Sequence, residues 1–114
     1  MPGPELGPRV ASPNPLAMWV ALCICELHLP GSRSLKDKRR VLRKIIARAQ
    51  ARFRLSISEV SHHDLHQRAT LGMAIVHGER AAVARLADQV RTLFDDTIDG
   101  YIVRWESDIL EYPE

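Results

Sequence analysis

The stretch LPGSRSLKDKRRVLRKIIARAQARF, residues 29–53, joins a strand signal to a helix signal and decides how this chain folds. Pro30 and Gly31 form a turn signal that closes the apolar run before them. Ser34 and Asp37 have the spacing of a capping box, although Asp is shorter than the usual Glu or Gln. Behind this cap, apolar residues recur at helical spacing: Leu35, Leu42, Ile45, Ile46, Ala49 and Phe53. The stretch therefore predicts the end of a strand, a turn and a long amphipathic helix.

The rest of the chain completes a set of four strands and two helices. Residues 19–29 are a continuous apolar run, typical of a buried strand, and residues 55–61 alternate between apolar and polar. Residues 69–77 form a second apolar run that ends at Gly78. Residues 79–94 have helical periodicity, with one apolar side made of Val83, Leu86, Ala87, Val90 and Phe94. After the turn at Asp99-Gly100, residues 101–112 predict a last strand, along which Val103, Trp105 and Ile109 alternate.

The predicted order of elements is therefore β-α-β-β-α-β. This order predicts an α+β fold, the ferredoxin-like sandwich, in which a four-stranded antiparallel sheet carries both helices on one face. Right-handed crossovers leave essentially one way to wind it. The chain has 114 residues, so we expect one such domain, over residues 18–114.

Residues 1–17 differ in composition from the rest of the chain. Five of the first fifteen residues are prolines, and the segment has no periodicity, so we expect a disordered N-terminal extension. It lacks the apolar region of a signal peptide. Because Met18 stands where the first strand begins, an alternative is that translation starts there and that residues 1–17 are a mis-called extension.

The cysteines and the hydropathy indicate a cytoplasmic protein. No stretch approaches the roughly 20 apolar residues of a membrane span. Cys23 and Cys25 stand two apart in the first strand, which points both thiols to one face in a poor geometry for a disulfide. We therefore expect two buried core thiols in a reducing compartment.

The helix predicted within residues 29–53 is far more basic than the chain as a whole. Residues 33–54 hold ten Lys or Arg and one acid, whereas the formal net charge of the chain is +2. On a helical wheel one exposed face, with nothing acidic beside it, collects Lys36, Arg39, Arg40, Arg43, Lys44, Arg48 and Arg52. Pairs such as Arg39 and Arg43 stand at i,i+4, where like charges repel. A polyanionic partner, which Arg33 in the preceding turn would also contact, accounts for this face better than solvation alone does.

Lys38 is the cation that breaks this pattern, because it falls within the apolar stripe. One interpretation is that its side chain extends outward from the first helical turn to reach water. The other is that it pairs with a buried carboxylate. Glu59 is the candidate, since it shares strand phase with Leu55 and Ile57 and so points toward the helices. Arg68 is a second possible partner for Glu59.

A polar segment between the two central strands, residues 61–68, holds three histidines. His62, His63, Asp64 and His66 are all possible metal ligands. Adjacent His62 and His63 point to opposite sides of an extended chain, however, and no recognised ligand spacing is present. We therefore predict no metal site and no cofactor, and interpret the segment as a surface loop.

Two motifs make the chain resemble a known family. They are ELHLPGSRSLKDKRR at residues 26–40, and Glu59-Val60 followed by DLHQRATLG at residues 64–72. On these residues the chain resembles the YlxP-like family, small bacterial proteins long classed as a domain of unknown function, over about residues 18–110. The resemblance implies a ferredoxin-like fold and a polar motif cluster made of Lys38, Glu59, Asp64, Gln67 and Arg68. Relatives often carry an aromatic residue in place of His66, which weakens a metal site further.

The resemblance also implies a context for function. Genes of the family commonly lie beside those for transcription and translation-initiation factors and a ribosome-binding factor. We therefore expect a non-enzymatic accessory protein that binds RNA or a ribosomal subunit through the phosphate backbone. One alternative is a protein-interaction or dimerisation module that uses the open sheet face. Another is an acylphosphatase-like enzyme, with an anion bound by Arg33 and the turn at residues 30–34.

Overall fold

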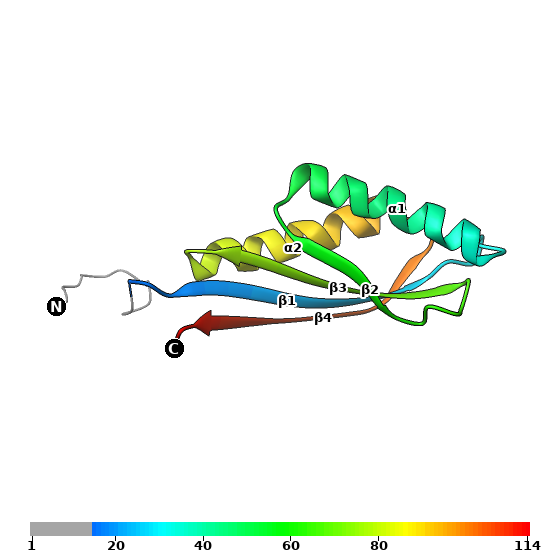
Figure 1. Ribbon diagram of the computed structural model, residues 1–114. Coiled ribbons are helices and arrows are strands. Elements are labelled where there is room, and N and C mark those ends of the chain that lie inside the picture. Colours follow the sequence, from blue (N-terminus) through cyan, green and yellow to red (C-terminus); the bar gives the residue numbers. More distant parts are fainter. Residues whose placement is uncertain (1–14) are drawn as a thin grey trace.

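The computed structural model describes residues 15–114, and in that range the elements follow the predicted order (Figure 1). They are β1 (Met18–His28), α1 (Leu35–Arg52), β2 (Ser56–Ser61), β3 (Arg68–His77), α2 (Arg80–Thr97) and β4 (Tyr101–Tyr112). The predicted disordered extension lies outside the described residues except for residues 15–17. None of the described helices is long and apolar enough to cross a membrane.

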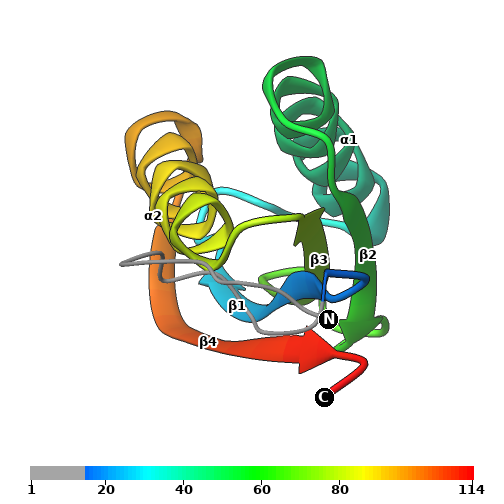
Figure 2. The ribbon, with the colours of Figure 1, turned by 90° about the vertical axis from the view of Figure 1, so that its left-hand side faces the viewer.

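The four strands form one antiparallel sheet in the order β2-β3-β1-β4. Both helices lie on the same face of this sheet, so the predicted ferredoxin-like α+β fold is confirmed (Figure 2). The core lies between the helices and the sheet and takes every second residue of β1: Ala21, Cys23, Cys25 and Leu27, all almost fully buried. Leu22 and Ile24 alternate with them and are exposed on the opposite face, the open face of the sheet.

The two cysteines are free and buried, as predicted. Burial raises the pKa of the Cys23 thiol to about 11 and that of Cys25 to about 12, with nearby Asp88 and Asp95 respectively adding to the effect. Both thiols are therefore neutral core groups at physiological pH.

One prediction for β4 is wrong. The pairing of β1 with β4 shifts between Glu26 and Leu27, because Val103 is an extra residue in a β-bulge. Trp105 and Ile109 pack against the core as their alternation requires, but Val103 is exposed. Beyond the bulge the phase is reversed, so Ile102 takes the inward position.

The helices agree with the prediction except at their ends. Ser34 is the N-cap of α1, and its hydroxyl accepts the backbone N–H of Asp37 at 3.0 Å. Leu35, predicted as part of the apolar stripe, is 38% exposed and does not join the core. Helix α2 runs three residues beyond the predicted end at Phe94, to Thr97.

Candidate nucleic-acid interface

Lys38 is buried, and its ammonium group is fully occupied by the chain itself. The residue is 1% exposed. Its Nζ donates to Glu59 Oε2 at 2.7 Å and lies within hydrogen-bond distance of three carbonyl oxygens, those of His62 at 2.8 Å, Arg68 at 3.1 Å and His63 at 3.3 Å. Of the two interpretations of Lys38, pairing with Glu59 is therefore confirmed and extension into water is wrong.

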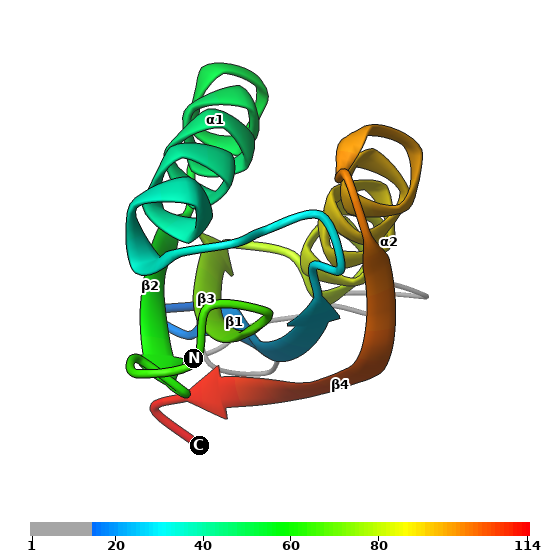
Figure 3. The same ribbon diagram turned by 90° about the vertical axis from the view of Figure 1, so that its right-hand side faces the viewer.

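The contacts of Lys38 fix the β2–β3 connection against α1. They hold the carbonyls at both ends of residues 62–68, while Gln67 returns from that segment to donate its side-chain amide to the carbonyls of Pro30 and Ser32. The backbone N–H of Leu29 also donates to the carbonyl of Gln67 at 2.8 Å. The two motifs of the sequence are thus joined into one structural unit at one end of the molecule, shown facing the viewer in Figure 3.

The other members of the motif cluster do not all join this unit. Arg68 offers its backbone carbonyl to Lys38, but its guanidinium pairs with Glu26 at 3.6 Å and not with Glu59. Asp64 is exposed, and within residues 15–114 its side chain makes no hydrogen bond or ion pair. The predicted cluster is therefore a structural contact between Lys38 and Glu59, with Gln67 beside it.

The histidines of residues 61–68 have separate roles. His62 has a positive φ of 64°, which turns the chain after β2, and its Nδ1 lies 2.7 Å from the hydroxyl of Thr70. His63 Nε2 lies 3.2 Å from the carbonyl of Glu59. Among the described residues, no three side chains of the metal-ligating types gather into a group.

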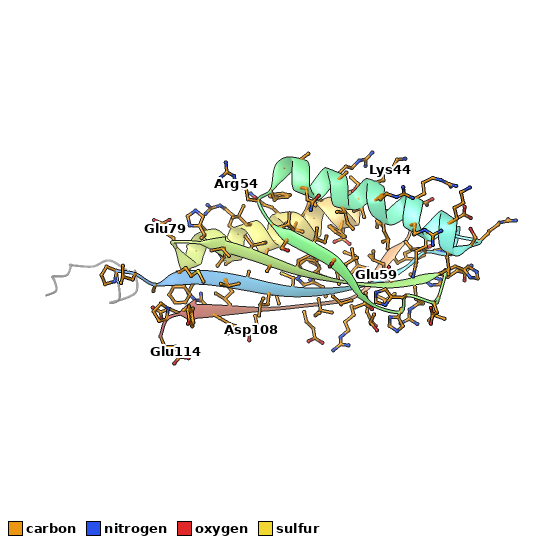
Figure 4. All side chains as sticks on the ribbon, viewed as in Figure 1. Lys44, Arg54, Glu59, Glu79, Asp108 and Glu114 are labelled. Carbon is orange, nitrogen blue, oxygen red and sulfur yellow. The ribbon has the colours of Figure 1, made fainter. Side chains whose placement is uncertain are left out.

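The cations of α1 divide into two rows that have different surroundings. The groove row consists of Arg40, Lys44, Arg48 and Arg52, which line the groove between α1 and α2. The outer row consists of Lys36, Arg39 and Arg43, which are exposed and do not line this groove. Figure 4 shows Lys44 of the groove row on the side of α1 away from the sheet.

The expectation that nothing acidic stands beside the cationic face is wrong for the groove row. Asp88 and Asp96 of α2 line the part of the groove that holds Arg52. Asp99, in the turn after α2, lines the part that holds Arg40, Lys44 and Arg48, and Arg40 pairs with Asp37 at 3.4 Å. In residues 15–114, Arg40 is the one cation of either row within ion-pair distance of a carboxylate. Lys44, Arg48 and Arg52 form no ion pair within that range either, but they share their groove with these acids and the outer row does not, so the charge of the outer row is less compensated.

The N-terminus of α1 already holds a carboxylate. Asp37 Oδ2 accepts the backbone N–H of Arg33 at 3.0 Å, while Ser34 accepts that of Asp37. An anion bound there in the manner of an acylphosphatase would have to displace Asp37 from the helix end that its charge stabilises. The geometry thus favours Arg33 as part of the cationic surface over Arg33 as part of a phosphate-binding loop.

The open face of the sheet carries different kinds of side chain at different positions along the strands. At the end next to α1's first turn, neighbouring strands place Arg68, His28 and Tyr101 side by side. Farther along, a hollow of about 520 Å³ has Gly72, Ala74, Leu22 and Ile24 between serines of β2 and the carboxylates of Glu106 and Asp108. Figure 4 shows Asp108 on the side of the sheet away from the helices.

Comparison with known proteins agrees with the motifs. The family model described as "Protein of unknown function (DUF503)" matches residues 20–107. The uncharacterized protein YlxP of Bacillus subtilis (strain 168) is 37% identical over 84 residues, 72% of this chain and 91% of that protein. The de novo designed protein Foldit4 covers 86% of this chain and 98% of its own, at 11% identity and a TM-score of 0.45, too low to add to the argument.

The match to the family model runs from β1 to the middle of β4 and includes both helices, β2 and β3 in full. It includes Lys38, Glu59 and Gln67, the residues that join the two motifs in space. The chain therefore belongs to the DUF503 family, the YlxP-like proteins of unknown function.

Proposed function

We propose that this protein is a non-enzymatic accessory factor that binds RNA, in the ribosome or free, through the phosphate backbone. The cationic surface consists of the outer row, Lys36, Arg39 and Arg43, together with Arg33. Cations on one helix face contact successive phosphates without reading bases, so the binding has little sequence specificity. Two buried free thiols suit a cytoplasmic site of action.

The observation that carries this proposal is the lack of internal compensation for the outer row. Lys36, Arg39 and Arg43 are exposed, and none is within ion-pair distance of a carboxylate among residues 15–114. Arg39 and Arg43 stand at i,i+4, where two like charges destabilise a helix by a few tenths of a kcal/mol. A bound polyanion would offset this repulsion, because both arginines would be attracted to its phosphates.

The test is retention of the protein on ribosomal subunits in co-sedimentation at two salt concentrations. Each phosphate contact adds about 0.7–0.9 to the slope of log affinity against log salt, so we expect strong loss of binding at the higher concentration. Arg39→Glu/Arg43→Glu should weaken binding at low salt and lower the slope by about 1.5 or more. The matched control is Arg80→Glu/Arg85→Glu, which makes the same charge change on exposed positions of α2.

Two results would contradict the proposal. One is equal retention of wild type and Arg39→Glu/Arg43→Glu. The other is an equal loss in the α2 control, which would show that net charge alone governs retention and that the outer row has no special part.

A second candidate function, association through the open sheet face, is favoured by the hollow at Leu22, Ile24, Glu106 and Asp108. Leu22 is 44% and Ile24 37% exposed, which is unusual for large apolar residues at the centre of a sheet. The simplest partner for this face is a second copy of the chain, which would form a homodimer. Sedimentation equilibrium of wild type and Ile24→Lys tests it: a dimer that the substitution dissociates supports this function, and a monomeric wild type rejects it.

A further inference from the structure

The bulge in β4 brings an aromatic pair to the open face of the sheet. Because Val103 is the extra residue, Tyr101 lies opposite His28 in the pairing with β1, on the side away from the helices. Gly100 permits this close approach, since a Cβ at that position would lie 2.3 Å from the carbonyl oxygen of His28. The start of β4 is thus held tightly against the end of β1.

The two rings form a surface that is open to solvent. Their centroids are 6.3 Å apart and their planes differ by 13°, so the rings are nearly parallel. Tyr101 is 63% exposed. Since β4 is an edge strand, no further strand of the described chain lies beyond Tyr101 on that side. A planar ligand can therefore stack on this pair from the sheet edge.

Two arginines flank the aromatic pair. Arg68 lies opposite His28 on β3, and Arg104 lies opposite Glu26, which is the next position of β1 on the open face. Each has one carboxylate partner: Glu26 for Arg68 at 3.6 Å, and Glu106 for Arg104. A guanidinium has five N–H donors, so both arginines keep donors for an anion. Their side chains are 42% and 55% exposed.

This aromatic site is close to the proposed RNA-binding helix. His28 ends β1, and α1 begins at Leu35, seven residues later. The side chain of Gln67 and the backbone of Leu29 tie the β2–β3 connection to the turn between them. Figure 3 shows the start of α1, the β2–β3 connection and the start of β4 at the same end of the molecule.

We propose that His28, Tyr101, Arg68 and Arg104 form a binding site for an unpaired nucleotide of RNA. The base stacks on Tyr101 and His28, and the adjoining phosphate is bound by the arginines. This inference rests on the proposed function and makes the ligand more specific. The ligand is RNA with a single-stranded segment next to the part that α1 contacts. A fully paired duplex has no free base for this site.

The test compares binding of a 12-nucleotide oligouridine and a 12-base-pair RNA duplex, measured by fluorescence anisotropy. Tyr101→Ala should weaken binding of the single strand by roughly 5- to 150-fold, the range of one lost base stack, and leave duplex binding unchanged. Tyr101→Phe keeps the ring and should retain wild-type affinity. Val103→Ala, at another exposed apolar position of the same strand, is the matched control.

The outcome separates this inference from the proposed function. Arg39→Glu/Arg43→Glu should weaken single strand and duplex alike. If that variant weakens both while Tyr101→Ala changes neither, the nucleotide site is overturned and the proposed function stands. If wild type binds neither RNA, both fail. If Tyr101→Ala changes the sedimentation of the protein and not its RNA affinity, the aromatic pair is covered by a second copy of the chain, which also overturns the inference.

Discussion

Lys38 and Arg39 are adjacent in the sequence, yet the chain treats their charges in opposite ways. Lys38 is buried, and Glu59 and backbone carbonyls occupy its ammonium group. Arg39 is exposed and, within residues 15–114, has no carboxylate within ion-pair distance. The same fold thus gives the ammonium group of Lys38 a full set of acceptors and leaves the guanidinium of Arg39 without a carboxylate partner. The comparison teaches that the inner cation belongs to the structure, whereas the outer row stays available for the polyanionic partner that we propose.

The largest expected effect comes from removing the buried cation. Lys38→Met leaves the carboxylate of Glu59 without its ammonium partner and removes one of the two donors of the His62 carbonyl, and breaking one partner of a buried ion pair costs about 3–5 kcal/mol. We expect the free energy of unfolding, measured by urea denaturation, to fall by that amount. Lys38→Met/Glu59→Leu should recover much of the loss, because apolar replacement of both partners removes the unpaired charge.

If Lys38→Met lowers the free energy of unfolding by less than about 1 kcal/mol, the inner cation is no more structural than the outer ones, and the contrast between them does not hold. RNA binding by the folded fraction of Lys38→Met is a second test of the contrast between the two cations. We expect affinity close to wild type, since Lys38 is not exposed to any ligand.

The cysteines extend the comparison to a second pair of buried titratable groups. Their folded pKa values, about 11 for Cys23 and about 12 for Cys25, lie above the unfolded value of 9.0 because burial disfavours the thiolates. The stability they contribute is therefore fully present below pH 9 and is lost as pH rises toward 11–12. Urea denaturation between pH 8 and 11 should show wild type losing more stability than Cys23→Ala/Cys25→Ala. Equal pH dependence in the two proteins would contradict the prediction.

The sequence predicted much of the fold because the signals that set it are local. Helical spacing, the Ser34 cap and the apolar runs act within one element, and they place the helices and strands correctly, although Leu35, Leu22 and Ile24 are exposed. The pairing of Lys38 with Glu59 could also be predicted from the sequence as one of two alternatives. Both residues stand at inward positions of their elements, so only the choice between that pair and a solvated lysine depended on the tertiary structure.

Two features of the site could not be predicted from the sequence, because each depends on contacts between elements distant along the chain. The acids of α2 face the groove row only after the two helices pack side by side. The bulge at Val103 arises in the pairing of β4 with β1, and it moves Tyr101 to the open face. One signal of that bulge was present: Ile102 and Trp105 are both large and apolar but are three residues apart, which a regular strand cannot bury on one face.

The smallest expected effect concerns the outer row without any ligand. Arg43→Glu removes the repulsion between Arg39 and Arg43 at i,i+4 and should raise stability by about 0.2–0.5 kcal/mol at low salt. Lys44→Glu makes the same charge reversal in the groove row, where Arg40 and Arg48 both stand at i,i+4. It should give no gain, because Asp99 lines that groove and attracts the native cation.

Thermal unfolding at about 20 mM and about 500 mM NaCl, below and above physiological ionic strength, measures this difference. The gain from Arg43→Glu should disappear at the higher salt, where charges on an exposed helix are screened. If Arg43→Glu and Lys44→Glu behave alike at low salt, the two rows are electrostatically equivalent. The outer row would then have no excess charge for a phosphate backbone to neutralise. A gain confined to Arg43→Glu means instead that the chain carries this charge at a cost to its own stability, as a surface selected for binding does.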